Sequence, residues 1–311
     1  MKKRFLTKGI CLVLSTGMIL SMAGCGKKDN QSDTQESTMV KESTMAANND
    51  VKETTTEATT KADEPTSRKG TKILSMQEIQ ALDNTRVNWG SGGETDENNV
   101  PIGCNMYQEK YGKYNADFVR EKKGKKIFLT FDEGYENGYT SKILDTLKEK
   151  NVKAVFFVTM PYVKEQPKLI KRMIKEGHIV GSHSVTHPSN GMVSLSLKEQ
   201  QNEMNKLHDY VSKKFDGYDM KLFRYPAGIF STQSLALMQS LGYTSVFWSF
   251  AYYDYDVNNQ LDHATALKKI ESSLHPGGIF LLHAVSKTNA EILGQLIDDI
   301  RQKGYKIERY Y

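Results

Sequence analysis

From Lys126 to the C-terminus, short apolar runs alternate with amphipathic helical patterns. Between the first two runs, residues 139–150 place Ile143, Leu144 and Leu147 on one helical face. Alternation of this kind predicts right-handed crossovers and a parallel sheet. The seven predicted strands are 127–131, 154–158, 179–181, 222–224, 244–248, 279–282 and 305–307. The predicted helices are 139–150, 167–177, 196–214, 233–241, 264–274 and 289–303.

The number of strands limits the possible α/β architectures. About seven strands in residues 126–311 are too few for a complete eight-fold barrel. We therefore expect a distorted, incomplete (β/α) barrel of about seven parallel strands, preceded by an irregular N-terminal extension. An open doubly wound sheet is the alternative.

The first 25 residues have the pattern of a targeting segment. Four cations precede an apolar run of about 14 residues, shorter than the ~20 residues that cross a membrane. The run ends in Met22-Ala23-Gly24-Cys25, which resembles a bacterial lipoprotein signal in which Cys25 carries the lipid. This predicts an extracytoplasmic protein held on the membrane by a lipid anchor, in the cell envelope or the forespore envelope. An ordinary cleaved signal and a short uncleaved anchor are the alternatives.

Composition separates the rest of the chain into further parts. No aromatic residue occurs between Phe5 and Trp89, so residues 26–70 are predicted to be a disordered linker. Residues 71–125 contain aromatics among Gly and Asn, and we expect an extension that packs on a catalytic domain, 126–311. Without the four cations of the first eight residues, the formal net charge of +5 becomes +1. Net charge therefore gives no reason to expect nucleic-acid binding.

Polar residues whose side chains could act in catalysis or bind a metal follow the predicted strands at their C-terminal ends. That edge is where parallel α/β folds build active sites. Asp132 and Glu133 follow the first strand, and His183 and His187 follow the third. Arg224 ends the fourth strand, Asp254 lies after the fifth, and His283 follows the sixth.

Two of these histidines have a spacing that suits a metal. His183 and His187 are four residues apart, which on a helical turn would put both imidazoles on one face. Two histidines and one carboxylate leave a coordination position open for water, as in catalytic zinc sites. Asp132 and Glu133 could divide the work, one binding the metal and the other taking a proton from water. In the simpler alternatives the two acids cap the following helix and His283 is a core histidine.

Five motifs in order resemble the NodB-homology domains of carbohydrate esterase family 4, the polysaccharide deacetylases. They are residues 130–134 (TFDEG), 183–187 (HSVTH), 224–228 (RYPAG), 248–256 and 281–283 (LLH). Residues 135–140 (YENGYT) and 283–290 (HAVSKTNA) are more similar still to the delta-lactam-biosynthetic, PdaA-type de-N-acetylases. The resemblance covers residues 126–311.

The resemblance implies a role for each residue of the first three motifs. Asp132 would be the general base, oriented by Arg224. His183 and His187 would bind one divalent metal ion, with zinc expected first and cobalt or manganese as alternatives. Glu133 replaces the family's usual metal-binding aspartate and is a further candidate ligand, although PdaA-type enzymes often have asparagine there.

The remaining motifs would supply the general acid and the residues that line the substrate-binding site. His283 would be the general acid, held by Asp254, and the backbone N–H near Ala227 would contribute to an oxyanion site. Trp248 and two residues that depart from the family pattern would line the substrate-binding site. The departures are Tyr225, which replaces a proline, and Tyr255, which replaces a tryptophan of the acetyl pocket.

The implied activity is metal-dependent removal of the N-acetyl group from muramic acid in peptidoglycan. In the PdaA-type branch the freed amine closes onto the lactyl carboxyl as muramic delta-lactam in spore cortex, after an amidase has removed the peptide. The expected partner is a peptidoglycan glycan strand, with membrane contact only through the lipid anchor. Alternatives are an N-acetylglucosamine or other exported-glycan deacetylase, including one for O-acetylated xylan, and a non-catalytic glycan-binding lipoprotein.

Overall fold

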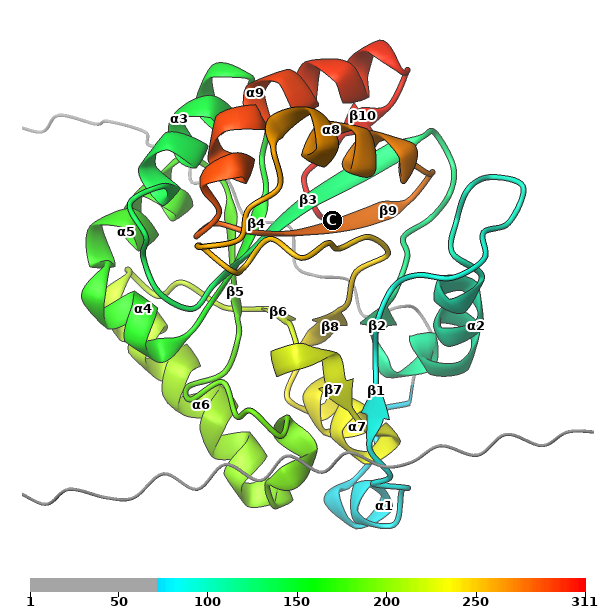
Figure 1. Cartoon of the computed structure of the whole chain (residues 1–311). Coiled ribbons are helices and arrows are strands. Elements are labelled where there is room, and N and C mark those ends of the chain that lie inside the picture. The colour runs from blue at the N-terminus through cyan, green and yellow to red at the C-terminus, as the bar shows by residue number, and fades with distance from the viewer. Residues whose placement is uncertain (1–71) are drawn as a thin grey trace, which may run out of the picture. The chain divides into compact units, whose positions relative to one another are not determined.

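The computed structural model describes residues 72–311 (Figure 1). The predicted signal segment 1–25, with Cys25, and the predicted linker 26–70 lie outside the described residues. Between residues 72 and 311 no helix has the length and apolar character needed to cross a membrane.

The central sheet contains all seven predicted strands. They are β3 (Lys126–Glu133), β4 (Val155–Val158), β5 (Ile179–Ser182), β6 (Leu222–Phe223), β8 (Thr244–Val246), β9 (Gly278–His283) and β10 (Lys306–Ile307). An eighth strand, β2 (Ala116–Asp117), was not predicted and pairs in parallel with β8. The strand order is β10-β3-β4-β5-β6-β8-β2, and β9 also pairs with β3 along its length.

The sheet curls until its two ends approach each other. After β8 the chain meets β9 at a parallel bridge between Phe250 and Phe280. The N–H of Leu281 donates to the carbonyl of Phe250 at 2.9 Å. The predicted distorted barrel of parallel strands is confirmed, and the open doubly wound sheet is excluded (Figure 1).

Alternation along the strands separates an inner core from an outer one. In β3, Phe128 belongs to the inner core, whereas Leu129 and Phe131 pack with the helices, as the period of two along a strand requires. Tyr310, just after β10, fills the base of the barrel, and its hydroxyl donates to Asp117 at 2.5 Å. The other inner-core residues are Val155, Phe157, Ile179, Leu222, Val246 and Ile279.

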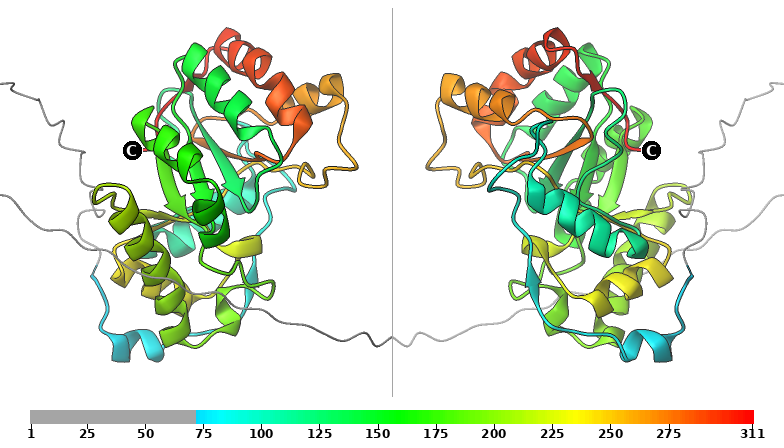
Figure 2. Two further views of the ribbon diagram at one scale, coloured as in Figure 1. Left: turned by 90° about the vertical axis from the view of Figure 1, so that its left-hand side faces the viewer. Right: turned by 90° about the vertical axis from the view of Figure 1, so that its right-hand side faces the viewer.

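Helices surround the strands on the outside (Figures 1 and 2). The six predicted helices correspond to α3 (Thr140–Glu149), α5 (Pro167–Lys175), α6 (Leu197–Lys214), α7 (Thr232–Ser240), α8 (His263–Ser272) and α9 (Lys287–Gln302). The capping-box pattern at Ser196 and Glu199 does begin a helix. The short helix α4 (Met160–Glu165), which the side chain of Thr159 caps, was missed.

The segment before residue 126 contacts the barrel. It forms α1 (Met76–Gln80), β1 (Val87–Asn88), α2 (Ile102–Tyr111) and the 3-10 helix η1 (Gly112–Tyr114). β1 pairs antiparallel with β7 (Ile229–Phe230). The indole N–H of Trp89 donates to the backbone carbonyl of Trp248 at 3.0 Å, and its ring packs edge-on against Phe118. These contacts fix the backbone that carries Trp248.

Candidate active site

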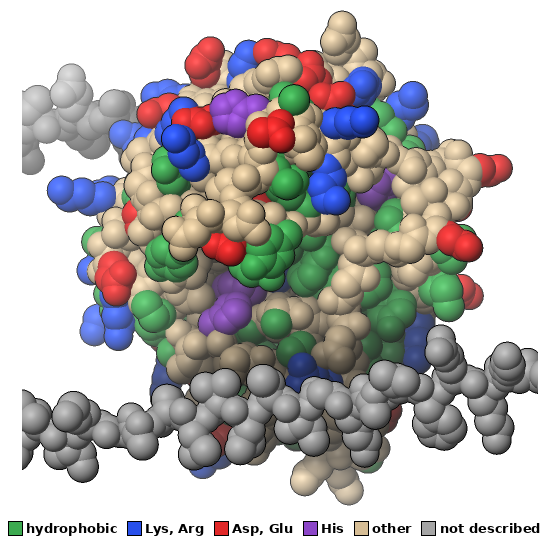
Figure 3. All heavy atoms as spheres, viewed as in Figure 1, with side chains coloured by type: hydrophobic (Ala, Val, Ile, Leu, Met, Phe, Trp, Pro, Cys, Tyr) green, Lys and Arg blue, Asp and Glu red, His purple; other side chains and the backbone are tan. Residues whose placement is uncertain are grey.

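A cleft of about 830 Å³ opens at the C-terminal ends of the parallel strands. Figure 3 shows histidine side chains at the middle of the face seen in Figure 1, flanked by hydrophobic side chains. Residues far apart in sequence contribute to this cleft because the strands that carry them end at one rim. The predicted site residues that line it are Asp132, His183, His187, Tyr225, Ala227, Trp248, Tyr255 and His283.

A buried arginine holds one carboxylate in place. Arg224 has no solvent exposure, and its Nη1 donates to Oδ1 of Asp132 at 2.8 Å. Its other nitrogens donate to the backbone carbonyls of Val246 and Phe247, each at 3.1 Å. Burial, the largest single influence, would raise the pKa of Asp132, but the charge and hydrogen bond of Arg224 together with the charges of His183 and His283 hold that pKa below its usual value. Asp132 is therefore ionised at neutral pH.

The two histidines meet, but a loop brings them together rather than the helical turn that was predicted. Residues 183–187 follow β5 without helical structure, and both Ser184 (φ 68°) and His187 (φ 49°) have left-handed backbone conformations. The hydroxyl of Ser184 accepts from the N–H of His187 at 3.0 Å, which closes the turn. The ring centroids of His183 and His187 lie 4.7 Å apart. The prediction of proximity is confirmed and its helical basis is wrong.

The hydrogen bond of His183 fixes which of its nitrogens is free. Nδ1 lies 2.8 Å from the carbonyl oxygen of Arg224, so it must donate, and Nε2 keeps its lone pair. Nε2 lies 3.5 Å from Oδ2 of Asp132. Burial lowers the pKa of His183 to about 4, so the ring is neutral. A neutral imidazole whose second nitrogen is hydrogen-bonded to a carbonyl is the usual form of a metal ligand.

Glu133 lies away from the cleft. Because adjacent residues of a strand point to opposite faces, its side chain leaves the barrel interior that Asp132 faces. It is fully buried and accepts from the hydroxyl of Thr140 at 3.3 Å. Burial, followed by the nearby charge of Glu136, raises the pKa of Glu133 well above its usual value. This geometry gives no support to Glu133 as a metal ligand.

His283 is held by a chain of buried polar groups. Its Nδ1 donates to Oδ1 of Asp254 at 2.7 Å, and its backbone N–H donates to the other carboxylate oxygen. Burial disfavours the charged ring, but the hydrogen bond and charge of Asp254 prevail, so the pKa of His283 lies above its ordinary value. Asn289 completes the chain by donating to Asp254 at 2.6 Å and accepting from Tyr252. Sequence reasoning missed Asn289, since nothing in the spacing connects it to Asp254.

Aromatic side chains line the walls of the cleft. One residue of the wall has a strained backbone conformation. Tyr225 is buried and stacks on Phe247 with a ring distance of 5.5 Å, while Tyr255 is half exposed and meets His283 edge-on. Ala227, in the 3-10 turn η3 (Pro226–Gly228), has φ 54°. A left-handed conformation is unfavourable for alanine and tends to persist at functional sites. Trp248 is half-buried beside Arg224.

The donor set suits a divalent ion held by two imidazoles. The free Nε2 of His183, the ring of His187 and the carboxylate of Asp132 are close together in the cleft. Within residues 72–311, no group of three or more His, Cys, Asp or Glu side chains is arranged to hold a metal.

Comparison with known proteins establishes the family. The polysaccharide deacetylase family model matches residues 119–246. The chain is also 40% identical, over 228 residues, to the peptidoglycan-N-acetylmuramic acid deacetylase PdaA of Bacillus subtilis, covering 73% of this chain and 86% of that protein. The chain belongs to the polysaccharide deacetylase family and is a carbohydrate esterase that acts on N-acetyl amide bonds.

Other relatives agree with this assignment. The solved structure of Bacillus subtilis PdaA, described as a family 4 carbohydrate esterase, superimposes with a TM-score of 0.69 and covers 73% of this chain and 96% of that one. The peptidoglycan-N-acetylglucosamine deacetylase PgdA of Listeria monocytogenes is 35% identical over 189 residues, covering 60% of this chain and 38% of that protein.

Proposed function

We propose that this protein removes the N-acetyl group of N-acetylmuramic acid in peptidoglycan. The observation that carries the proposal is the arrangement of Asp132 with Arg224 and His283 with Asp254 around one cleft. One pair keeps a carboxylate ionised and the other favours a protonated imidazole. A carboxylate that accepts a proton and an imidazolium that donates one are what amide hydrolysis requires.

The proposed reaction uses each group once. Asp132 accepts a proton from the water whose oxygen bonds to the acetyl carbonyl carbon. His283 donates its proton to the sugar nitrogen as the carbon–nitrogen bond breaks, so the products are acetate and a free amine. Arg224 does not touch the reacting atoms and instead fixes the carboxylate. Ala227 would present its backbone N–H to the developing oxyanion.

A divalent metal ion held by His183 and His187 belongs to this proposal, with zinc first and cobalt or manganese as alternatives. When bound, it would polarise the acetyl carbonyl and lower the pKa of water. Glu133 is left out of the ligand set because its carboxyl group lies behind β3, against Thr140.

The named activity of PdaA supports muramic acid as the substrate sugar. We propose that the freed amine forms muramic delta-lactam in spore cortex after an amidase has removed the peptide, and that the protein is a Cys25-anchored lipoprotein. A deacetylase for N-acetylglucosamine is the second candidate, favoured by the similarity to PgdA. The segments 1–25, 26–70, 71–125 and 126–311 remain our proposed division of the chain.

Mass spectrometry of digested glycan distinguishes the two sugars. Purified peptidoglycan, with and without prior amidase treatment, is incubated with the protein and cut into disaccharides. We expect the acetyl group to be lost from the muramic acid residue, and only after amidase treatment. Loss from glucosamine alone would overturn the muramic assignment and favour the second candidate.

A further inference from the structure

A second large hollow lies at the opposite end of the barrel from the cleft. Its volume is about 890 Å³. Ile179, the first residue of β5, and Lys221, just before β6, lie on its wall, so it opens at the N-terminal ends of the strands. One side comes from α5, and Arg309 and Tyr311 after β10 form another. We call this hollow the base groove.

Positive charge predominates in the base groove. Its acidic side chains are Asp216 and Asp219. Lys221 pairs with Asp219 at 2.5 Å, and Nε of Arg309 donates to the carbonyl of Gly177. The cationic side chains that line the groove are Lys168, Lys171, Lys175, Lys214, Lys221 and Arg309.

Three lysines of α5 have no counter-charge within the described residues. Lys168, Lys171 and Lys175 are exposed, and no acid lies within ion-pair distance of them. Their spacing of three and then four residues puts them on one stripe of the helix. Arg172, on the same helix, instead pairs with Asp145 at 2.5 Å and Glu176 at 2.7 Å. Because like charges at this spacing repel one another, the stripe disfavours the helix unless an anion occupies it.

The floor of the base groove is apolar and aromatic. Phe215 and Ile179 are buried in this floor, and the hydroxyl of Tyr218 accepts from the N–H of Val180 at 2.8 Å. A concave surface with an apolar floor and a cationic rim can enclose a chain. A flat bilayer would meet the rim and leave the floor uncovered.

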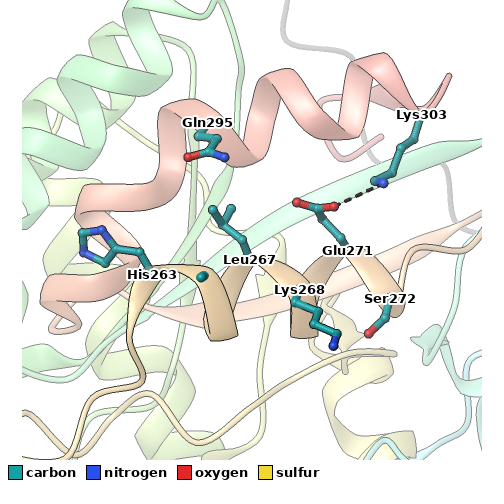
Figure 4. A pocket seen from close by; sticks show the side chains of 8 residues that line it. His263, Leu267, Lys268, Glu271, Ser272, Gln295 and Lys303 are labelled. Atoms are coloured by element: carbon teal, nitrogen blue, oxygen red, sulfur yellow. Dashed lines mark ion pairs between the residues drawn. The ribbon is translucent and has the colours of Figure 1, made fainter.

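A smaller hollow elsewhere on the molecule is lined by two lysines, Lys268 and Lys303, of which Lys303 is paired. A cavity of about 640 Å³ lies between α8 and α9 (Figure 4). There Lys303 pairs with Glu271 at 3.2 Å, as the dashed line marks, so its charge is compensated. The stripe in the base groove has no such partner.

We propose that the base groove binds a linear polymer with repeated phosphate groups, whose phosphates contact Lys168, Lys171 and Lys175. Lysine is a compact point charge that suits phosphate without demanding a fixed orientation. The site is separate from the catalytic cleft, so polymer and glycan can be held at the same time at opposite ends of the barrel. The proposal concerns a polymer chain and not the headgroups of a bilayer.

The test uses the full chain and inorganic polyphosphate labelled with a fluorophore, with anisotropy measured at physiological ionic strength. The groove variant replaces Lys168, Lys171 and Lys175 by Gln, which removes three charges from exposed positions. The control variant replaces Lys148, Lys198 and Lys268 by Gln, which are also exposed and lie outside the groove. Thermal unfolding of both variants confirms that each is folded.

We expect the groove variant to lose affinity by about tenfold or more and to show a weaker salt dependence, because three charge contacts are gone. The control should stay within about twofold of the parent. Deacetylation of short glycans should be unchanged in the groove variant, which separates this proposal from the proposed function. Equal losses in both variants, or no binding by the parent, would overturn it. The proposal would also be overturned if the groove lysines are required for binding to vesicles with one-third phosphatidylglycerol but not for binding to polyphosphate.

Discussion

Asp132 and Glu133 are consecutive residues, yet their carboxyl groups lie on opposite sides of β3. Asp132 accepts from Arg224 at 2.8 Å inside the barrel, whereas Glu133 accepts from Thr140 at 3.3 Å in the outer layer. The pKa of Asp132 lies below its usual value and that of Glu133 well above it. The surroundings of the two neighbouring acids thus favour opposite forms, the ionised one for Asp132 and the neutral one for Glu133.

This difference predicts opposite outcomes for two amide substitutions. Glu133→Gln replaces the carboxyl group by an amide of the same size that lies outside the cleft, so zinc affinity and turnover should stay within about threefold of the parent. Asp132→Asn removes the proposed base and should lower turnover by about 10²- to 10⁴-fold. Calorimetric zinc titration and acetate release are measured for both variants. A large loss of zinc affinity in Glu133→Gln would show that Glu133 is a ligand after all.

Arg224 acts through Asp132, and a lysine should not replace it. Lys presents one ammonium group and cannot reproduce the three hydrogen bonds to Asp132, Val246 and Phe247. We expect Arg224→Lys to lower kcat by about tenfold or more with a smaller effect on KM, because the base is misplaced rather than the substrate site lost.

The control for this prediction is Arg172→Lys, at an arginine with surface ion pairs to Asp145 and Glu176. Surface pairs contribute about 0–1 kcal/mol, so its activity should be unchanged. Parent-like kcat in Arg224→Lys would contradict the positioning role. A thermal melt of each variant separates misfolding from a catalytic effect.

The pH profile should depend on Asp254. His283 acts in its protonated form, and Asp254 keeps its pKa above the ordinary value, so activity falls as pH rises through that raised pKa. Asp254→Asn removes the charge that stabilises the imidazolium, so the alkaline limb of kcat/KM should move to lower pH. An alkaline limb that stays in place, or moves to higher pH, would show that His283 is not the acid.

Gly277 should be essential for stability at the base of the barrel. Its φ is 76°, and a Cβ there would lie 2.3 Å from the carbonyl oxygen of Arg120. Gly242 has a similar φ of 83° with nothing within 4 Å of such a Cβ. Gly242→Ala should therefore cost only the left-handed penalty of about 1–2 kcal/mol, and Gly277→Ala clearly more. Equal changes in Tm for the two variants would contradict the predicted clash.

The fold was largely predictable from local patterns. Apolar runs and helical periodicity are properties of short windows, and they located seven strands and six helices. β2 was missed because two residues, Ala116 and Asp117, make no detectable pattern and join the sheet only by pairing with β8. Tyr310 likewise enters the inner core through tertiary packing, which no local window contains.

The site was predictable where residues follow strands, and less so where loops decide. Asp132, Arg224 and His283 meet because parallel strands end together. The loop that joins His183 to His187 depends on a positive φ at Ser184, and the local sequence does not predict that conformation. Asn289 reaches Asp254 from the first turn of α9, 35 residues away in sequence. The direction of the Glu133 side chain required the register of β3.

Acetate release from purified peptidoglycan tests the central claim most directly. The parent protein, loaded with zinc, is compared with Asp132→Asn and with parent protein treated with a chelator, and free amines are counted in parallel. We predict one new amine for each acetate with the parent protein, and loss of nearly all release in both comparisons. Equal acetate release by the parent and Asp132→Asn, or none by either, would contradict the assignment of this cleft as a deacetylase site.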